Sequence, residues 1–399
     1  MTSYVADFDF RKPTMDVEIM NRENPLKRLG TLGQSIWLDY IRRDLIVSGE
    51  LRRLIEEDGI RGMTSNPAIF EKAIAGSNDY DEDIRAQALL GKDIETIYAS
   101  ISQHDVQNAA DEFRSLYDRT DGQDGYVSLE VNPHLAHDTK ATIEEARRLW
   151  TALNRPNVMI KVPATSDGLP AIQQLISEGI NVNVTLLFGL PRYRQVVEAY
   201  IAGLEARASH GHPVHHIASV ASFFLSRIDT LVDPLVEQSL ASGTTTNRPR
   251  GVQGQVAISS AKAAYQIYKE IFGSARFKKL ADAGARVQRL LWASTSNKNP
   301  DYSDVKYVES VIGPDTINTV PPATIDAYRD HGDPKSRLEQ NIEEANWILQ
   351  RLPELGISID KVTQQLEDEG VGKFNEPFDK LMKALTKKSL PITEQPSAG

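Results

Sequence analysis

The feature that most limits the fold of this chain is a regular alternation of short apolar runs with longer amphipathic stretches. Eight runs rich in β-branched and aromatic residues recur along the sequence, at 35–41, 59–66, 125–131, 157–165, 180–188, 215–224, 289–295 and 316–322. Stretches with helical periodicity lie between them, among them 45–57, 94–117, 139–153, 191–208 and 255–272. Strands that alternate with helices pair in parallel through right-handed crossovers. Eight such units predict an α/β fold, a closed (β/α)8 TIM barrel. An open doubly wound sheet is the alternative, but no glycine-rich phosphate-binding turn follows the first strand.

Two intervals between the runs are longer than one strand and one helix require. The segments from 66 to 130 and from 222 to 294 are each about twice the length of a single βα unit, which predicts extra helices after strands two and six. Within the second interval, 241–251 is expected to be an exposed loop. Further helices are expected at the C-terminus, at 335–351 and 374–386, followed by a disordered tail at 388–399. We expect one barrel domain over 1–387, with an N-terminal extension, because no Pro- or Gly-rich linker divides it.

Composition narrows the class of protein. The 399 residues are 40% hydrophobic and 25% charged, as in a folded globular protein. The chain has no cysteine, which excludes disulfides, thiolate metal sites, iron–sulfur clusters and a cysteine nucleophile. A net charge of -10 argues against a broad nucleic-acid-binding surface. The first residues lack the apolar stretch of a signal peptide, and the most apolar run, 184–190, is too short to cross a bilayer. We therefore expect a cytoplasmic protein that contacts neither membrane nor nucleic acid.

Polar residues interrupt strands that should be apolar. Parallel barrel strands are covered on both faces and should consist of nearly continuous apolar runs. The exceptions lie toward the C-terminal halves of the expected strands, at Asp39, Asn66, Glu130, Lys161, Asn183, Thr185, Ser222 and Ser294. In a (β/α)8 barrel the active site is assembled from side chains at these strand ends. Their coincidence predicts a functional site at that end of the barrel.

Some of these residues have structural explanations. A serine in a strand can bond to nearby backbone, Asn66 before Pro67 can cap the next helix, and Asp39 can pair with Arg42 or Arg43. Lys161 and Glu130 are harder to explain, because each is a charged residue within an apolar run. A buried charge without a partner is costly, so these two are expected to be paired or functional.

A buried lysine suggests a particular chemistry. An amine attacks carbonyls only when it is unprotonated, and desolvation favours the neutral form. Its product with a ketone is a Schiff base, whose iminium withdraws electrons from the adjacent carbon–carbon bond. Breaking that bond requires a base to accept a hydroxyl proton from the substrate. A lysine accompanied by Asp, Glu and polar amides is therefore a minimal set for aldol chemistry.

Six segments of this chain resemble those of the transaldolases. The two most specific are GMTSNPAIF at 62–70 and VMIKVPATSDGLPAIQQL at 158–175. The resemblance continues, in order, through SLEV at 128–131, INVNVTLLF at 180–188, SFFLSRID at 222–229 and LWASTSNKNP at 291–300. It covers most of the chain and is greatest with the longer bacterial, cyanobacterial and plant branch of the family.

The resemblance implies a Schiff-base enzyme of the class I aldolase type that needs no cofactor or metal. Such transferases of the pentose phosphate pathway move a dihydroxyacetone unit from sedoheptulose 7-phosphate to glyceraldehyde 3-phosphate, giving erythrose 4-phosphate and fructose 6-phosphate. It further implies that Lys161 forms the Schiff base and that Asp39 accepts the proton of the donor C4 hydroxyl. Glu130, through a water held by Thr185, would handle the proton transfers of imine formation.

The same resemblance assigns substrate contacts. It implies that Asn66 and Asn183 hold donor hydroxyls, that Ser222 lines the site, and that Arg227 faces the phosphate. One departure concerns the phosphate. The shorter branch of the family has Ser-Phe-Arg after strand seven, where this chain has Ser294, Thr295 and Ser296, so Lys298 is the candidate replacement for the missing arginine.

Two other functions remain open at this point. A fructose 6-phosphate aldolase uses the same Schiff base but releases free dihydroxyacetone; that branch is expected to have Gln at position 130 and Tyr at position 224. Glu130 and Phe224 therefore favour the transferase. A barrel that binds phosphosugars without catalysis would not need a buried Lys and Glu together.

A histidine-rich tract suggests a third alternative, a metal-dependent aldolase. His210, His212, His215 and His216 are close in sequence, and clustered histidines can bind metal ions. However, they precede the sixth strand, which predicts a position at the end of the barrel opposite to the candidate site, so we expect no metal there. The sequence leaves open whether the chain is a monomer or a homodimer.

Overall fold

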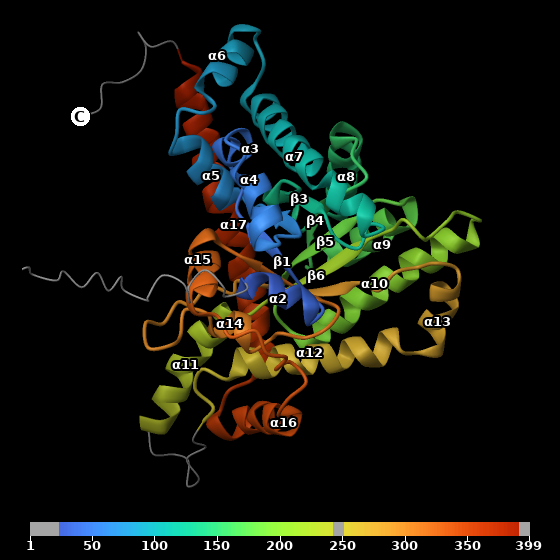
Figure 1. The fold of residues 1–399 in the computed structure, drawn as a ribbon, viewed down its shortest axis with the longest axis vertical. Helices are drawn as coiled ribbons and strands as arrows, with labels where there is room; N and C mark the ends of the chain where they lie inside the picture. The colour runs from blue at the N-terminus through green and yellow to red at the C-terminus, as the bar shows by residue number, and fades with distance from the viewer. Residues whose placement is uncertain (1–23, 242–250, 391–399) are drawn as a thin grey trace, which may run out of the picture.

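Eight parallel strands form a closed barrel in sequence order (Figure 1). The computed structural model describes residues 24–241 and 251–390. The strands are β1 (Gln34–Asp39), β2 (Gly62–Thr64), β3 (Tyr126–Glu130), β4 (Val158–Pro163), β5 (Val182–Leu187), β6 (Ser219–Phe224), β7 (Arg289–Ala293) and β8 (Thr316–Val320). β8 pairs with β1 and closes the sheet. The (β/α)8 prediction is confirmed. Each strand is shorter than the expected run because pairing with both tilted neighbours, rather than apolar character, sets its ends.

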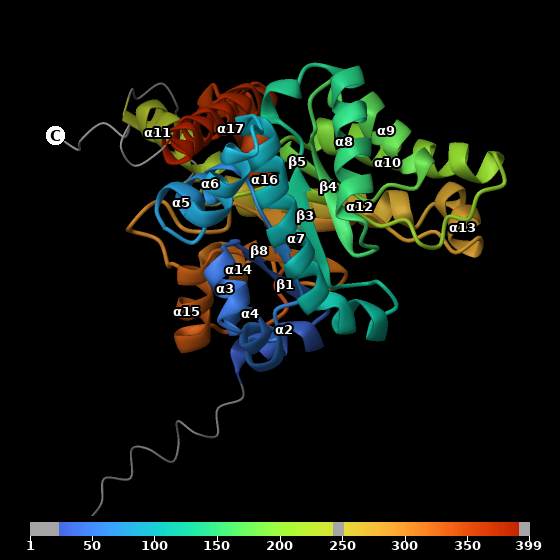
Figure 2. The same cartoon turned by 90° about the horizontal axis from the view of Figure 1, so that it is seen from above.

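Helices surround the barrel on its outer face (Figure 2). Three match stretches predicted from the sequence, α8 (Thr139–Leu153), α10 (Leu190–Ser209) and α12 (Val256–Phe272), and α9 (Gly168–Glu178) lies between β4 and β5. In α8 the buried side chains Thr142, Ala146, Leu149 and Leu153 recur every three or four residues, which places one helical face against the sheet. The remaining outer helices are α2 (Pro25–Thr31), α14 (Lys306–Glu309) and α15 (Pro322–His331).

The two long intervals contain the extra helices expected there. After β2 come α5 (Pro67–Ala75), α6 (Asp81–Leu89) and α7 (Ile94–Arg119). After β6 come α11 (Ser226–Ala241), α12 and α13 (Ala275–Asp282). The expected loop at 241–251 falls almost wholly on residues 242–250, which lie outside the described part of the chain.

The stretch 45–57 is not one continuous helix, which corrects the sequence prediction. It divides into α3 (Arg43–Val47), α4 (Glu50–Arg53) and a π-helical turn, η1 (Leu54–Asp58). Gly49 separates the first two with φ of 82°, a left-handed conformation that glycine adopts without strain. The apolar periodicity continues across this break, so the hydrophobic pattern alone did not reveal it.

The C-terminal helix is much longer than predicted. The segment 335–351 is helical only as α16 (Ile342–Arg351), followed by the short 3-10 turn η3 (Leu352–Leu355). The expected helix 374–386 is the second half of α17 (Ile359–Ser389), which continues through Pro377. Its buried residues, including Phe374, Phe378 and Leu381, hold it against the molecule on both sides of the proline. The helix packs on α5, α6, α7, α11 and β5, and so brings a distant part of the chain to the barrel.

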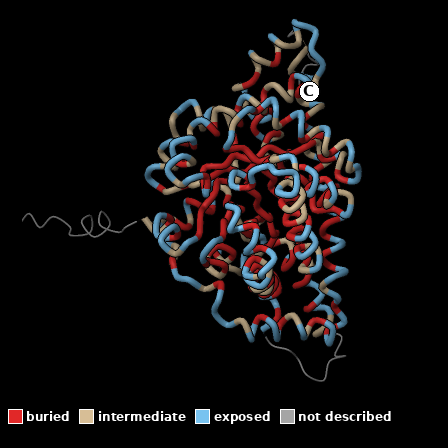
Figure 3. Tube along the Cα trace, turned by 90° about the vertical axis from the view of Figure 1, so that its right-hand side faces the viewer, coloured by how far each residue is buried: buried red, intermediate tan, exposed pale blue. Residues whose placement is uncertain are grey.

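The core lies within and directly around the barrel, where the strands are buried along their lengths (Figure 3). Trp37 on β1 and Trp292 on β7 are fully buried. Across residues 24–241 and 251–390, no helix combines the length and apolar character needed to cross a membrane.

Candidate active site

A cavity of about 150 Å³ opens where the strands end. Eight residues predicted for the site line it: Asp39, Asn66, Lys161, Ser222, Phe224, Arg227, Ser294 and Lys298. Five further residues line it that the sequence did not single out: Thr64, Ala293, Ser296, Thr319 and Phe374. Side chains from β1, β2, β4, β6, β7 and β8 therefore meet in one space, at the end of the barrel where catalytic residues of this fold are found.

Lys161 lies at the centre of this arrangement. The register of the sheet pairs it with Glu130 on β3 and with Asn183 on β5. The residue is 5% exposed, and its Nζ donates a hydrogen bond of 3.0 Å to the carbonyl oxygen of Ser65. Nζ lies 3.7 Å from Glu130 Oε2 and 5.7 Å from the centre of the Phe374 ring. The amine thus has one carbonyl acceptor and one nearby carboxyl group, and it faces the cavity.

Glu130 is buried beside Lys161 but does not line the 150 Å³ cavity. Within the described residues neither carboxyl oxygen has a hydrogen-bond partner. Burial raises the pKa of Glu130 to about 7, against the opposing effect of the Lys161 charge. A carboxyl group with this pKa can both accept and donate protons near neutral pH.

Asp39 approaches the cavity from β1, and its Oδ1 accepts a 2.7 Å hydrogen bond from the Thr64 hydroxyl. Thr64 in turn lies 2.7 Å from the Thr319 hydroxyl, which links β1, β2 and β8. Burial raises the pKa of Asp39, while Lys161, Thr64 and Lys298 oppose the rise.

The alternative role of Asp39, a pair with Arg42 or Arg43, is wrong. Arg42 binds Asp79, and Arg43 binds Asp83 and Asp105, all outside the cavity. The carboxyl group of Asp39 therefore remains at the cavity that Lys161 also lines.

Asn183 and Thr185, both on β5, are fully buried and do not line the cavity. The Asn183 amide donates to Ser128 Oγ at 3.0 Å, and its oxygen accepts from Ser222 Oγ at 2.7 Å. Asn183, which is beside Lys161 in the sheet register, therefore links β3 and β6. Thr185 is fully buried, and its hydroxyl has no hydrogen-bond partner among the described residues.

Asn66 has the capping role considered for it and also lines the cavity. Its side-chain oxygen accepts a 3.0 Å hydrogen bond from the Ile69 backbone at the start of α5. Because this bond fixes the oxygen, the amide nitrogen is the part of the side chain that remains for other contacts.

Two cations form the other end of the cavity. Arg227 lies on α11, 5.8 Å from the Phe224 ring centre, and its Nη1 is buried and has no partner within the described residues. Lys298, in the loop after β7, donates to Ser296 Oγ at 2.8 Å. Burial lowers the pKa of Lys298, and the charge of Arg227 lowers it further, as does that of Lys72. Burial likewise lowers the pKa of Arg227. Like charges held together in this way are suited to an anion such as a phosphate group.

The residues that sequence reasoning missed fall into two groups. Thr64 and Thr319 are polar residues near the ends of β2 and β8, so the rule that selected the others would have selected them too. Phe374 belongs to α17, far from any strand in the sequence, and only the packing of that helix brings it to Lys161.

The histidine tract lies away from this site, in the segment between α10 and β6 that enters the barrel at its N-terminal end. The His215 and His216 rings lie 3.8 Å apart, centre to centre. In the described part of the chain, no group of three or more His, Asp or Glu residues is arranged to hold a metal ion.

The chain is similar to known proteins along most of its length. A family model described as transaldolase/fructose-6-phosphate aldolase matches residues 36–385, from β1 to α17. A protein named transaldolase from Trichodesmium erythraeum is 52% identical over 375 residues, covering 93% of this chain and 99% of that protein. One named transaldolase 2 from Nostoc punctiforme is 49% identical over 371 residues, 92% and 97% of the two chains. A transaldolase from Saccharopolyspora erythraea is 44% identical over 367 residues, 92% and 98% of the two chains.

Proposed function

The chain belongs to the transaldolase/fructose-6-phosphate aldolase family, and on that premise we propose that it is a transaldolase acting through a Schiff base on Lys161. It takes a dihydroxyacetone unit from sedoheptulose 7-phosphate and transfers it to glyceraldehyde 3-phosphate. The products are erythrose 4-phosphate and fructose 6-phosphate, and the reaction belongs to the cytoplasmic pentose phosphate pathway.

One observation supports this proposal above the others. Lys161, 5% exposed, faces a cavity that Asp39, Arg227 and Lys298 also line, with Glu130 Oε2 3.7 Å away. A phosphosugar-binding barrel without catalysis would gain nothing from a buried lysine beside a buried glutamate, because each buried charge costs free energy.

The first step joins the lysine to the donor. The amine of Lys161 attacks the ketone carbon, and loss of water from the adduct gives the iminium. Glu130 supplies and removes the protons of this step through a water held by Thr185. The assignment is supported by the pKa of Glu130, raised to about 7 by burial, and by the Thr185 hydroxyl, which has no partner in the described part of the chain.

The second step breaks the carbon–carbon bond. Asp39 accepts the proton of the donor C4 hydroxyl while the iminium of Lys161 accepts the bond electrons, giving an enamine and a free aldehyde. The hydrogen bond from Thr64 orients the Asp39 carboxyl group. Because burial raises the pKa of Asp39, it is a stronger base than an exposed aspartate.

The third step is the transfer itself. The enamine attacks the aldehyde of the acceptor, Asp39 returns the proton, and water releases the product. Phe224 and Phe374 line the cavity with hydrocarbon, so neither offers the enamine a proton. Arg227 and Lys298 hold the phosphates of donor and acceptor at the cationic end.

A fructose 6-phosphate aldolase remains the alternative within the family. The relatives named transaldolase favour the transferase, and so does Phe224, since a tyrosine at that position would place a hydroxyl group near the enamine. The two activities differ in the fate of the enamine, which can be measured.

Borohydride reduction with fructose 6-phosphate tests both chemistry and residue. We expect a dihydroxyacetone-derived adduct on Lys161 by peptide mass analysis, little free dihydroxyacetone, and formation of sedoheptulose 7-phosphate when erythrose 4-phosphate is added. Lys161→Ala should show neither adduct nor turnover, and chelators should have no effect. An adduct on Lys140 or Lys298 would refute the assignment of Lys161, and release of dihydroxyacetone as fast as transfer would establish the aldolase instead.

A further inference from the structure

A second cavity, of about 120 Å³, lies behind Glu130 on the outer side of the barrel wall. It is enclosed by the ends of β2 and β3 and by α5, α7, α8 and α17. Figures 1 and 2 show α7 and α8 beside β3 on this side of the molecule, and both helices contact each other. Among the described residues, Asn66 alone lines both this cavity and the one that holds Lys161. The two spaces therefore adjoin at the end of β2 but have different walls.

Glu130 stands between the two cavities. Its residue lines the rear cavity, while its Oε2 lies 3.7 Å from the Nζ of Lys161. Both carboxyl oxygens are buried, and neither has a hydrogen-bond partner within the described residues. A buried carboxyl group normally has partners, so both oxygens remain free to bind further groups or waters.

Tyr98 and Glu145, which carry protic groups, line the rear cavity together with Glu130. Tyr98, on α7, lines the rear cavity, and its ring is held edge-on between Phe70 and Phe378, at 6.0 and 5.7 Å between ring centres. Glu145, on α8, also lines it and is bound by Arg148 at 2.7 and 2.8 Å. The Arg148 side chain is 54% exposed, so this ion pair reaches solvent.

The chemistry proposed for Lys161 requires water and protons to be exchanged with solvent. Forming the imine releases one water, hydrolysing it consumes one, and protons enter and leave through Glu130. A sugar phosphate that fills a cavity of about 150 Å³ blocks that route while the intermediate exists. A path for water and protons that avoids the substrate is therefore useful to a transferase.

We propose that the rear cavity is a proton and water inlet for Glu130, in which the Tyr98 hydroxyl passes protons between Glu130 and Glu145. This inference rests on the proposed function of Lys161. In the outward direction, protonated Glu130 gives its proton to the Tyr98 oxygen as the phenolic proton passes to the Glu145 carboxylate and from there to solvent. One proton moves, Tyr98 is neutral before and after, and nothing is oxidised or reduced.

The charges around the inlet are consistent with this role. Burial raises the pKa of Tyr98, and the neighbouring carboxyl groups of Glu130 and Glu145 raise it further, whereas a hydrogen bond with the Ser102 side chain opposes the rise. Tyr98 therefore stays protonated, and its hydroxyl donates a proton only when it accepts another. Glu130 is itself faced by Lys161 from β4 and by Asp39 from β1, and Glu95 and Arg148 are the other charged residues that line the rear cavity.

Tyr98→Phe tests the inlet because it removes one oxygen and keeps the ring. We expect kcat for transfer to fall about tenfold, a part of the roughly 10²–10⁴-fold that positioned proton transfer contributes. The solvent deuterium isotope effect on kcat should rise, and imidazole added to the buffer should restore part of the rate. Glu145→Gln, at a partly exposed position, should reproduce these changes if Tyr98→Phe folds poorly. Tyr117→Phe, on the same helix but outside the cavity, is the matched control and should change none of them.

The outcomes separate this inference from the proposed function. If the unaltered enzyme gives no borohydride adduct on Lys161, the Schiff-base assignment fails. The inlet is refuted if Tyr98→Phe and Glu145→Gln form the adduct as the unaltered enzyme does and also leave kcat, the isotope effect and the response to imidazole unchanged. The Schiff-base assignment stands in that case.

Discussion

The carboxyl groups of Asp39 and Glu130, near Lys161, differ in their hydrogen bonds. Asp39 accepts a hydrogen bond from Thr64, whereas both oxygens of Glu130 are without partners in the described residues. Burial raises the pKa of both, and that of Glu130 reaches about 7. Raised pKa values of this kind lower the stability of the folded protein above neutral pH, and they are common at catalytic sites.

Glu130→Gln should remove part of the pH dependence of the protein's stability. The folded protein keeps the Glu130 proton up to a pKa of about 7, whereas the unfolded chain loses it near 4.5. The folded state thus binds more protons between these values, and its stability falls as pH rises through them, by about 3 kcal/mol from this group. Denaturant unfolding at pH 5 and pH 8 should show that Glu130→Gln removes this decline. Exposed Glu144→Gln should leave it in place, and a decline of the same size in both variants would contradict the pKa of Glu130.

Phe224→Tyr should shift the enzyme toward aldolase activity. The ring packs 5.1 Å from Phe188, centre to centre, and borders the cavity of Lys161. A hydroxyl group added there can protonate the enamine and lead to its hydrolysis. With fructose 6-phosphate alone, release of free dihydroxyacetone should rise severalfold relative to transfer. Asp39→Ala should slow both activities, because each requires cleavage of the carbon–carbon bond.

Arg227→Ala should mainly raise KM for phosphorylated substrates. A hydrogen bond to a charged group contributes about 1.5–3 kcal/mol, which corresponds to roughly 10- to 100-fold in KM. Because phosphate is held in both ground and transition states, kcat should change little. Lys298→Ala should act in the same direction but more weakly, since lysine is a point charge without the arginine fork. If neither variant changes KM, the phosphate end of the cavity has been assigned to the wrong residues.

At the scale of elements, hydrogen bonds join helix α11 to the loop after β7 and to α14, which follows that loop. Asp233 on α11 accepts a 2.7 Å hydrogen bond from the Tyr302 hydroxyl, and Asp229 accepts one of 2.8 Å from Tyr307. The same helix carries Arg227, and the same loop carries Lys298. These bonds therefore fix the distance between the two cations of the phosphate end.

Tyr302→Phe should loosen this connection without removing a residue of the cavity. With the bond to Asp233 gone, Lys298 is held less firmly, so KM for sugar phosphates should rise about two- to fivefold while kcat stays within about twofold. The same assay with an unphosphorylated ketose should show no change, because it does not use the cations. An equal effect on both substrates would indicate a general loss of structure instead.

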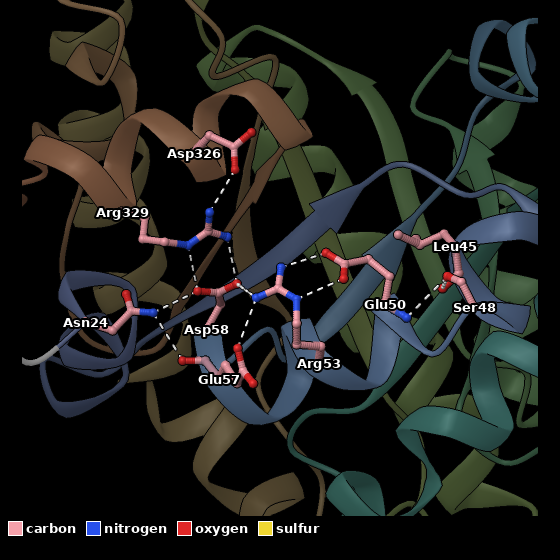
Figure 4. A network of polar contacts seen from close by, with 9 residues as sticks. All are labelled: Asn24, Leu45, Ser48, Glu50, Arg53, Glu57, Asp58, Asp326 and Arg329. Atoms are coloured by element: carbon pink, nitrogen blue, oxygen red, sulfur yellow. Dashed lines mark hydrogen bonds and ion pairs between the residues drawn. The ribbon is translucent and has the colours of Figure 1, made fainter. Parts of the chain in front are cut away.

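At the scale of the whole molecule, a buried carboxylate joins the start of the described chain to its last barrel unit (Figure 4). Asp58, in η1, accepts hydrogen bonds from Arg329 on α15 at 2.7 and 2.9 Å and from Asn24 before α2 at 2.7 Å. Burial alone would raise the pKa of Asp58, but the bonds from Arg329 and Asn24 bring it below its ordinary value. The network fastens the N-terminal end of the barrel across a separation of 271 residues.

Asp58→Asn should destabilise the fold by about 2 kcal/mol, because Arg329 loses its charged partner but remains partly exposed. Thermal unfolding should show a lower Tm at pH 7. Since the pKa of Asp58 is lowered in the folded state, its contribution is present above the ordinary value of 3.8 and is lost as pH falls through the folded value. The difference between the two proteins should therefore shrink in acid. Glu57→Gln, at the exposed neighbouring position, should leave Tm nearly unchanged.

The sequence by itself determined the barrel and the identity of its central residues. Strand periodicity and intervening helices were enough for eight parallel units, because each local pattern agrees with the same global fold. Lys161, Glu130 and Asp39 were identifiable because a charge within an apolar strand needs a partner or a function. The family followed from motifs around these residues, and the comparisons confirm it.

Only the tertiary structure decided which of these residues share a space. Asn183 is hydrogen-bonded to Ser128 and Ser222, and Glu130 lines a second cavity, because the closed sheet sets the register of its strands. Phe374 reaches Lys161 because α17 packs across the barrel, a contact between residues 213 positions apart in sequence for which local pattern has no signal. Local propensity acts over a few residues, whereas contacts at this range form when distant apolar faces are buried together, and that burial is a property of the folded molecule.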